Sequence, residues 1–154
     1  MSDLHLHLYP DPVLREICLP VLDFEADLAT LAEHMLEIMY QAHGRGLAGP
    51  QVGVSRRIFV MDASWKEGVK APVICINPEV LWMSDQMEYG EEGCLSIPDT
   101  PCRVQRPVEI DLRWVGSDGA LSEARLTGVV ARIVLHELDH LDGILCIDRH
   151  EAVS

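Results

Sequence analysis

The sequence is poor in positive charge and in aromatic side chains, and it contains no long apolar run. Its 154 residues carry 12 Lys and Arg against 25 Asp and Glu. The resulting net charge of -13 repels phosphate backbones at long range. Only three Trp, three Tyr and two Phe are available to stack on unpaired bases. These shortages disfavour nucleic-acid binding, and no hydrophobic stretch is long enough to cross a bilayer.

The amino terminus also lacks a cationic segment followed by an apolar stretch, so we expect no secretory signal and a cytoplasmic location. In that compartment cysteines are expected to be reduced thiols. Their odd number and irregular spacing agree with this, at positions Cys18, Cys75, Cys94, Cys102 and Cys146. The length and the absence of a linker or an internal repeat predict one domain over residues 1–154.

Helical and strand-like patterns follow one another in a simple order. We expect a short helix at 11–16, a longer one at 27–43, and a final helix at 127–141 that is capped by Thr127 and ended by Gly143. Strands are expected at 57–61, 72–76, 107–114 and 120–126, with a hairpin turn at 116–119. The order predicts an α+β fold in which an antiparallel sheet packs around the last helix, close to the C-terminus.

The strongest chemical signal is the run His136-Glu-Leu-Asp-His140 in this last helix. Residues four apart project from one helix face, so His136 and His140 are spaced to bind a single metal ion. Glu137 lies beside them and could take a proton from water activated by the ion. The apolar residues before His136 indicate a buried helix, where unpaired histidines would be costly.

The third metal ligand is open to two interpretations. Only 14 residues follow His140, and Cys146 among them gives a spacing like that of a zincin-type metallopeptidase, with Cys in place of His. The alternative is Cys94, whose neighbour Gly93 permits close backbone approach and whose following amides could face an anion. A second unusual segment, the glycine-rich loop 44–53, lacks the ending of a phosphate-binding loop and could present the amide of Gln51.

Three segments taken together resemble the peptide deformylase family. They are the Gly-x-Gly-Leu-Ala-x-x-Gln loop that ends at Gln51, the Glu-Gly-Cys-Leu-Ser segment around Cys94, and the His-Glu-x-Asp-His helix. They occur in the family's order, and the resemblance extends from about Pro10 to Asp148. The three motifs together point to the family far more specifically than any one of them does alone.

The resemblance implies a role for each matching residue. Cys94, His136 and His140 would bind the metal. Glu137 would be the general base and acid, with Gln51 and the Leu95 amide holding the formyl oxygen. Gly46 and Gly93 would border a groove in which the substrate backbone adds as a strand.

The resemblance also implies a reaction and its partners. The family removes the formyl group from N-formylmethionyl peptides and releases formate. One divalent ion is expected, Fe(II) first, with Zn(II), Ni(II) or Co(II) as substitutes. The N-formyl peptide is the expected substrate and the ribosome a transient partner in a bacterial or organellar translation compartment. Many relatives continue into a C-terminal helix, so docking through that helix is not expected here.

Two cations depart from the family pattern. Arg45 stands between the first two glycines of the loop, and Arg132 lies four residues before His136 on the same helix face, where the family has apolar residues. Either both arginines line the side-chain pocket of the substrate, or Arg132 pairs with a nearby carboxylate while Arg45 extends into solvent. In the first case we expect a polar or acidic first residue, or poor turnover of formyl-Met.

Three functions therefore remain to be compared. The first is metal-dependent deformylation, and the second is peptidase activity with Cys146 or a late carboxylate completing the site. The third is a divergent, non-catalytic paralogue that binds formyl peptides or metal. The presence of both Glu137 and Gln51 counts against the third, because a binding protein would not need both.

Overall fold

The computed structural model of the chain describes residues 4–24 and 26–151. The strands are β1 (Gly46–Ala48), β2 (Ile58–Met61), β3 (Val73–Met83), β4 (Met87–Cys94), β5 (Ile97–Pro107), β6 (Glu109–Val115) and β7 (Leu121–Thr127). The α-helices are α1 (Ala26–Gln41), α2 (Gly128–Leu141) and α3 (Cys146–Arg149). Three short 3-10 helices complete the order: η1 (Pro12–Arg15), η2 (Gly49–Val52) and η3 (Trp65–Glu67).

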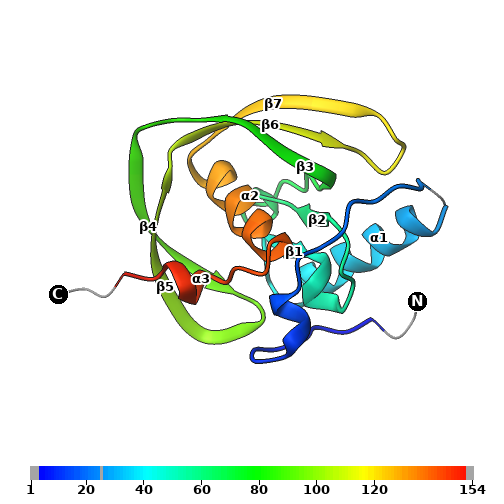
Figure 1. The fold of residues 1–154 in the computed structure, drawn as a ribbon, viewed down its shortest axis with the longest axis horizontal. Helices are drawn as coiled ribbons and strands as arrows, with labels where there is room; N and C mark the ends of the chain where they lie inside the picture. The colour runs from blue at the N-terminus through cyan, green and yellow to red at the C-terminus, as the bar shows by residue number, and fades with distance from the viewer. Residues whose placement is uncertain (1–3, 25, 152–154) are drawn as a thin grey trace.

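Helix α2 lies at the centre of the molecule, with strands on several sides of it (Figure 1). Five strands form one sheet in the order β1-β2-β3-β6-β7, and β4 pairs with β5 in a second sheet. Every pairing between these strands is antiparallel. The predicted α+β fold with its last helix against an antiparallel sheet is confirmed.

Strand β2 is buried on both faces because helices cover both sides of it. Its alternating side chains point in opposite directions, as in any strand. Phe59 and Met61 belong to a cluster with Val134 of α2, and Ile58 and Val60 belong to a second cluster with α1. From α1 the second cluster takes Leu28, Leu31, Ala32, Met35 and Met39, which recur at the helical spacing seen in the sequence. The sheet thereby fixes α2 from one side.

The β4–β5 hairpin fixes α2 from another side and delivers the mid-chain cysteine. Its pairing runs from Met87 opposite Pro107 to Cys94 opposite Ile97. Most of β4 is exposed, but Cys94 at its end is buried. A third apolar cluster seals the region, with Leu14, Cys94, Ile97, Cys102, Val104, Leu145 and Cys146.

The sequence predicts the C-terminal end of α2 correctly, but it does not predict how the N-terminal end is capped. Thr127 occupies the N-cap position, but its side chain makes no capping hydrogen bond, so the predicted cap is wrong. Thr127 is the last residue of β7, and pairing with Glu109 holds it there as a strand residue. At the other end the helix stops at Leu141, and Gly143 follows with φ +74°. A left-handed residue after the last turn is the usual place for glycine.

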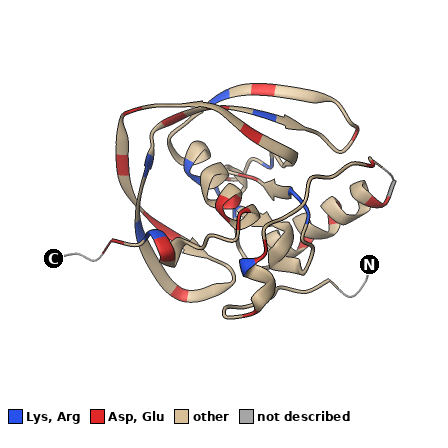
Figure 2. Ribbon diagram, viewed as in Figure 1, with Lys and Arg blue, Asp and Glu red and all other residues tan. Residues whose placement is uncertain are grey.

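Charged residues are interspersed along the described part of the chain rather than separated onto two faces (Figure 2). No helix among the described residues is long and apolar enough to span a membrane. All five cysteines are buried free thiols, as predicted.

Gly143, which follows the end of α2, should tolerate a side chain much less well than Gly119. A Cβ there would lie 2.5 Å from the Arg15 carbonyl oxygen, whereas a Cβ on Gly119, which has φ +84°, meets nothing within 4 Å. Both replacements strain the backbone by about 1 kcal/mol, and only Gly143→Ala adds a backbone collision. We expect Gly143→Ala to lower the free energy of unfolding by about 2 kcal/mol more than Gly119→Ala, measured by chemical denaturation. Equal losses would show that the close packing on η1 is unimportant.

Candidate metal centre and active site

Two histidines project from the buried face of α2. His136 and His140 are one helical turn apart, and their ring centroids lie 5.0 Å from each other. Both are buried, His140 completely. The helical spacing therefore brings the two imidazoles together as the sequence predicted.

Cys94 completes the group from the end of β4. Its Sγ lies 3.4 Å from Nε2 of His140, and the ligand atoms of Cys94, His136 and His140 all lie within 4.8 Å of one another. Within residues 4–24 and 26–151 this is the only cluster of at least three His, Cys, Asp or Glu that could hold an ion. The alternative third ligand is wrong, because Cys146 contacts Cys102 instead, with 3.3 Å between their sulfurs.

The three donors fit one metal ion. Ligand bonds of about 2.0–2.3 Å in tetrahedral geometry separate two donors by about 3.5 Å, close to the observed distance from Cys94 to His140. Burial lowers the pKa of His140 to about 3, which leaves its imidazole neutral and able to coordinate. Burial would also lower the pKa of His136, but hydrogen bonds with Cys94 and Glu92 outweigh it and raise the pKa to about 10. The same negatively polarised groups around His136 that favour a proton on its ring also favour a metal cation beside it.

A buried carboxylate orients His136. Glu92 Oε1 lies 2.8 Å from Nδ1 of His136, so the other ring nitrogen, Nε2, is left for the metal. The guanidinium of Arg106 donates to both Glu92 oxygens, at 2.6 and 2.9 Å. Burial alone would raise the pKa of Glu92, but the hydrogen bonds from Arg106 and His136 outweigh it and lower the pKa to about 2. Glu92 is therefore an anion that holds the ring in one orientation.

The same network continues along α2 and into α3. Arg106 also donates to Asp139 at 2.9 Å, and Arg149 donates to both Asp139 oxygens. Sequence reasoning did not assign roles to Glu92, Arg106 or Asp139. Asp139 and Glu92 stand inside the recognised motifs, but Arg106 lies 14 residues beyond Glu92 on the facing strand. Only a correct prediction of how β4 and β5 pair would have shown that Arg106 lies beside Glu92.

Glu137 lies next to the ligand group in an unusual environment. Its side chain is buried, and Oε1 has no hydrogen-bond partner among the described residues. Gly46 passes directly over it, since a Cβ there would lie 2.5 Å from Oε2. Burial raises the pKa of Glu137 to about 7, opposed in part by His136. A carboxyl group at this place can exchange a proton near neutral pH.

The amide of Gln51 is held in one orientation beside Cys94. Its Oε1 accepts a hydrogen bond from the Ala48 amide at 3.0 Å, which identifies Nε2 as the outward donor. Nε2 donates to Ser96 Oγ at 3.1 Å and lies 3.7 Å from the Cys94 sulfur. The segment 44–53, predicted to be a loop, contains the short strand β1 and the 3-10 helix η2. These two elements place Gln51 at the site.

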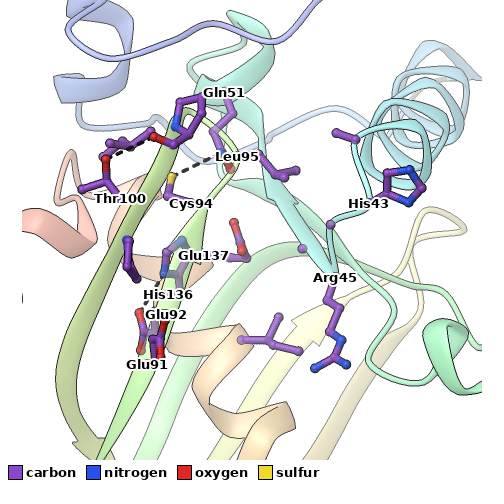
Figure 3. Close-up of a pocket in the computed structure, with 18 of the residues that line it drawn as sticks. His43, Arg45, Gln51, Glu91, Glu92, Cys94, Leu95, Thr100, His136 and Glu137 are labelled. Carbon is purple, nitrogen blue, oxygen red and sulfur yellow. Dashed lines mark hydrogen bonds and ion pairs between the residues drawn. The ribbon is translucent and has the colours of Figure 1, made fainter.

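An open cavity of about 1000 Å³ leads to this group. Its walls are β1 with the residues before it, the β4–β5 turn, and one face of α2. In Figure 3, Cys94, His136 and Glu137 lie together in the cavity, with Gln51 above them and Arg45 to their right. The sequence-predicted substrate residues Arg45, Gly46, Gly93 and Arg132 all line it, as does Leu95.

The two unexpected arginines have different partners. Arg132 donates to Glu92 at 2.8 Å and to the carbonyl oxygens of Val104 and Glu88 at 2.9 and 2.8 Å. Arg132 thus pairs with a nearby carboxylate, as the second alternative predicted, and it also lines the cavity. Arg45 does not simply extend into solvent, because its Nε is buried and the side chain lines the cavity.

Comparisons with known proteins agree with this site. The sequence profile of the polypeptide deformylase family matches residues 4–154. A peptide deformylase of Agrobacterium fabrum is 45% identical over 143 residues, which cover 93% of this chain and 84% of that protein. Peptide deformylase from Thermotoga maritima has a crystal structure with a TM-score of 0.91 at 42% identity, covering 97% of this chain and 98% of its own. A Synechococcus elongatus peptide deformylase, crystallised with actinonin, gives a TM-score of 0.93 at 35% identity, with coverages of 98% and 82%.

Removing the charge of Glu92 should weaken both the fold and the metal centre. We expect Glu92→Gln to lower the free energy of unfolding by about 3–5 kcal/mol, because it leaves buried cations with too few anions. Metal affinity should fall about 10–100-fold, because His136 loses its orienting partner. Chemical denaturation and competition with a chelator measure the two effects. The neighbouring exposed Glu91→Gln is the stability control, and a Glu92→Gln protein as stable as this control would contradict the supporting role of Glu92.

Proposed function

This chain belongs to the peptide deformylase family and is a peptide deformylase, and we propose that Glu137 carries the proton transfers of its reaction. The observation that supports this most directly is the buried carboxylate of Glu137, with one oxygen unpartnered among the described residues. It stands one residue from His136, beside Cys94 and at the end of the open cavity. A buried carboxyl with an unused oxygen is costly unless it acts on something that enters the site.

We assign Cys94, His136 and His140 as the ligands of the single ion. When bound, a divalent metal would supply Lewis acidity and lower the pKa of water toward neutrality. We further propose Fe(II) as the native ion, because a thiolate among two imidazoles suits a softer transition metal. Zn(II), Ni(II) and Co(II) suit the same donors and are the alternatives.

Glu137 would act twice in the hydrolysis. It accepts a proton from the water that attacks the formyl carbon, and it then gives a proton to the amine nitrogen as the carbon–nitrogen bond breaks. The products are formate and a peptide with a free amino terminus. One residue would serve both steps, because the proton that it accepts from the water is the proton that it passes to the departing nitrogen.

The developing negative charge on the formyl oxygen needs fixed donors. Gln51 Nε2 is oriented toward Cys94 by the Ala48 amide, so it can donate without reorganisation. The Leu95 amide, in the turn that follows Cys94, is assigned as the second donor. Both groups come from rigid segments that the fold holds next to the ligands.

The peptide backbone would lie as an added strand between Gly46 and Gly93. Strand β1 is at the end of its sheet, so one edge of it has no neighbouring strand in that sheet. Gly46 leaves room above Glu137, and a Cβ on Gly93 would meet nothing within 4 Å. The two glycines are therefore placed at opposite walls of the cavity without obstructing it.

A nascent-peptide substrate would bring the protein to the ribosome in a cytoplasmic or organellar translation compartment. The net charge of -13 opposes lasting attachment to RNA, so we propose transient contact. Residues 1–154 are proposed to act as one catalytic domain.

Glu137→Gln tests the proton transfers. We expect formate release from formyl peptides to fall about 10²–10⁴-fold, because the amide cannot accept the proton. Protein purified without oxygen should keep its metal, and elemental analysis of the parent identifies the native ion. Glu33→Gln, an exposed change on α1, is the control. Formate release by Glu137→Gln equal to that of the control would remove Glu137 from the mechanism.

Replacing the two cavity glycines should separate catalysis from binding. Gly46→Ala places a methyl group against the Glu137 carboxylate, so we expect kcat to fall at least about tenfold. Gly93→Ala leaves Glu137 in place and should change mainly KM. Steady-state kinetics with formyl-Met-Ala measures the difference. An unchanged kcat for Gly46→Ala would mean that the carboxylate position is not critical.

A further inference from the structure

The cavity beyond Glu137 is lined by cations as well as apolar side chains. Arg132 and Ile133 face it from α2, and Arg45 and Lys66 face it from the wall formed by β1 and η3. These side chains decide which first residue of a formyl peptide the cavity accepts. That role rests on the proposed function, because it requires the reacting formyl group to lie at Glu137.

The position of the first side chain is set by the covalent structure of the substrate. The formyl carbon is bonded to the nitrogen of the first residue, so the Cβ of that residue is only three bonds from the reacting carbon. Its side chain must therefore occupy the part of the cavity next to Glu137. Arg45 adjoins Gly46, which passes over Glu137, and Arg132 lies within two helical turns of Glu137 on the cavity face of α2.

Arg132 limits the space in this part of the cavity, and its hydrogen-bond donors are already occupied. Glu92 and two backbone carbonyl oxygens already accept from its guanidinium. The guanidinium also covers Gly90, because a Cβ on Gly90 would lie 2.7 Å from its Cζ. It is thus a fixed wall whose donors are already engaged, and only 19% of its side chain is exposed.

Of the two remaining cations, Lys66 is exposed and lies over the ring of Trp65, so Arg45 is the partly buried cation that is available to a substrate. Its ion pair from Nη2 to Glu67 is long, at 3.3 Å. Because Glu67 is 63% exposed, that pair contributes little. The Nε of Arg45 is buried and has no hydrogen-bond partner among the described residues. The Nη groups of Arg45 therefore hold one long, exposed contact and can bind an acceptor that the substrate brings into the cavity.

Apart from Glu67, which pairs with Arg45, the exposed acidic residues of the cavity lie on the other wall. Glu91 and Asp99 line the cavity from β4 and β5, where both are exposed to water. Exposed charges are screened over about 8 Å at physiological ionic strength, whereas a direct hydrogen bond is not. They leave Arg45 as the group that touches the side chain.

We propose that this enzyme selects N-formyl peptides whose first residue carries a carboxylate, which Arg45 binds. Glutamate and aspartate are the residues of this class. The neutral amide of a glutamine has the same shape but makes weaker bonds to a guanidinium. Methionine offers no acceptor of comparable strength and leaves the Arg45 Nε unpartnered.

The test compares four dipeptide substrates on metal-loaded enzyme: formyl-Glu-Ala, formyl-Gln-Ala, formyl-Met-Ala and formyl-Lys-Ala. We expect kcat/KM, followed as formate release, to be highest for formyl-Glu-Ala, by about tenfold or more over formyl-Gln-Ala. Arg45→Met should abolish that advantage, so that kcat/KM for formyl-Glu-Ala falls to about the value for formyl-Gln-Ala. Arg56→Gln removes an exposed arginine that does not line the cavity and should keep the parent's order.

Three results would overturn the proposal. They are a parent enzyme that prefers formyl-Met-Ala, one that prefers formyl-Lys-Ala, and a formyl-Glu preference that survives Arg45→Met. Binding of the same peptides to metal-loaded Glu137→Gln protein, measured by calorimetry, separates selectivity from catalysis. If no peptide releases formate from the parent, the proposed function fails. The order of binding affinities still decides whether Arg45 selects a carboxylate.

Discussion

The ionic contacts of Glu92 are the interaction on which the rest of the site depends. This one carboxylate, almost completely buried, joins β4 to Arg106 on β5 and to Arg132 and His136 on α2. It therefore ties the hairpin that supplies Cys94 to the helix that supplies both imidazoles. Such a group is expensive to bury, and its pairing with two guanidinium groups and a ring nitrogen compensates for the lost hydration. The bond from Arg106 to Asp139 and those from Arg132 to the carbonyl oxygens of Glu88 and Val104 strengthen the same link.

The buried carboxylates around the metal centre are of two kinds, which differ in whether their oxygens have hydrogen-bond partners. Glu92 and Asp139 are paired with cations and serve as supports, whereas Glu137 has an oxygen that no described residue satisfies. Glu137 lines the cavity, whereas Glu92 orients His136 and Asp139 holds Arg106 and Arg149. Arg132 extends the support to the cavity wall, which makes the shape of the cavity depend on the same network. The orientation of His136 and the position of the Arg132 wall thus depend on one set of buried contacts.

Much of the site was predictable because it follows from local geometry. His136 and His140 meet because helical residues four apart share a face, and β2 and α1 follow from runs of apolar residues. The residues alone left Cys94 and Cys146 as rival ligands, since spacing along the chain does not say where a hairpin points. The β4–β5 hairpin was missed because most of β4 is polar and exposed, and β5 contains three prolines. Arg106 was missed with it, and the Thr127 cap was wrong because β7 keeps that residue in a strand.

The central claim is that the sulfur of Cys94 and the two imidazoles hold one metal ion. The most direct measurement is the metal content of anaerobically purified Cys94→Ala and Cys146→Ala proteins, with thermal unfolding to confirm that both are folded. We predict that Cys94→Ala loses the ion and that Cys146→Ala keeps about one ion per chain, as the parent does. A folded Cys94→Ala protein with a full complement of metal, or a metal-free Cys146→Ala protein, would contradict the claim.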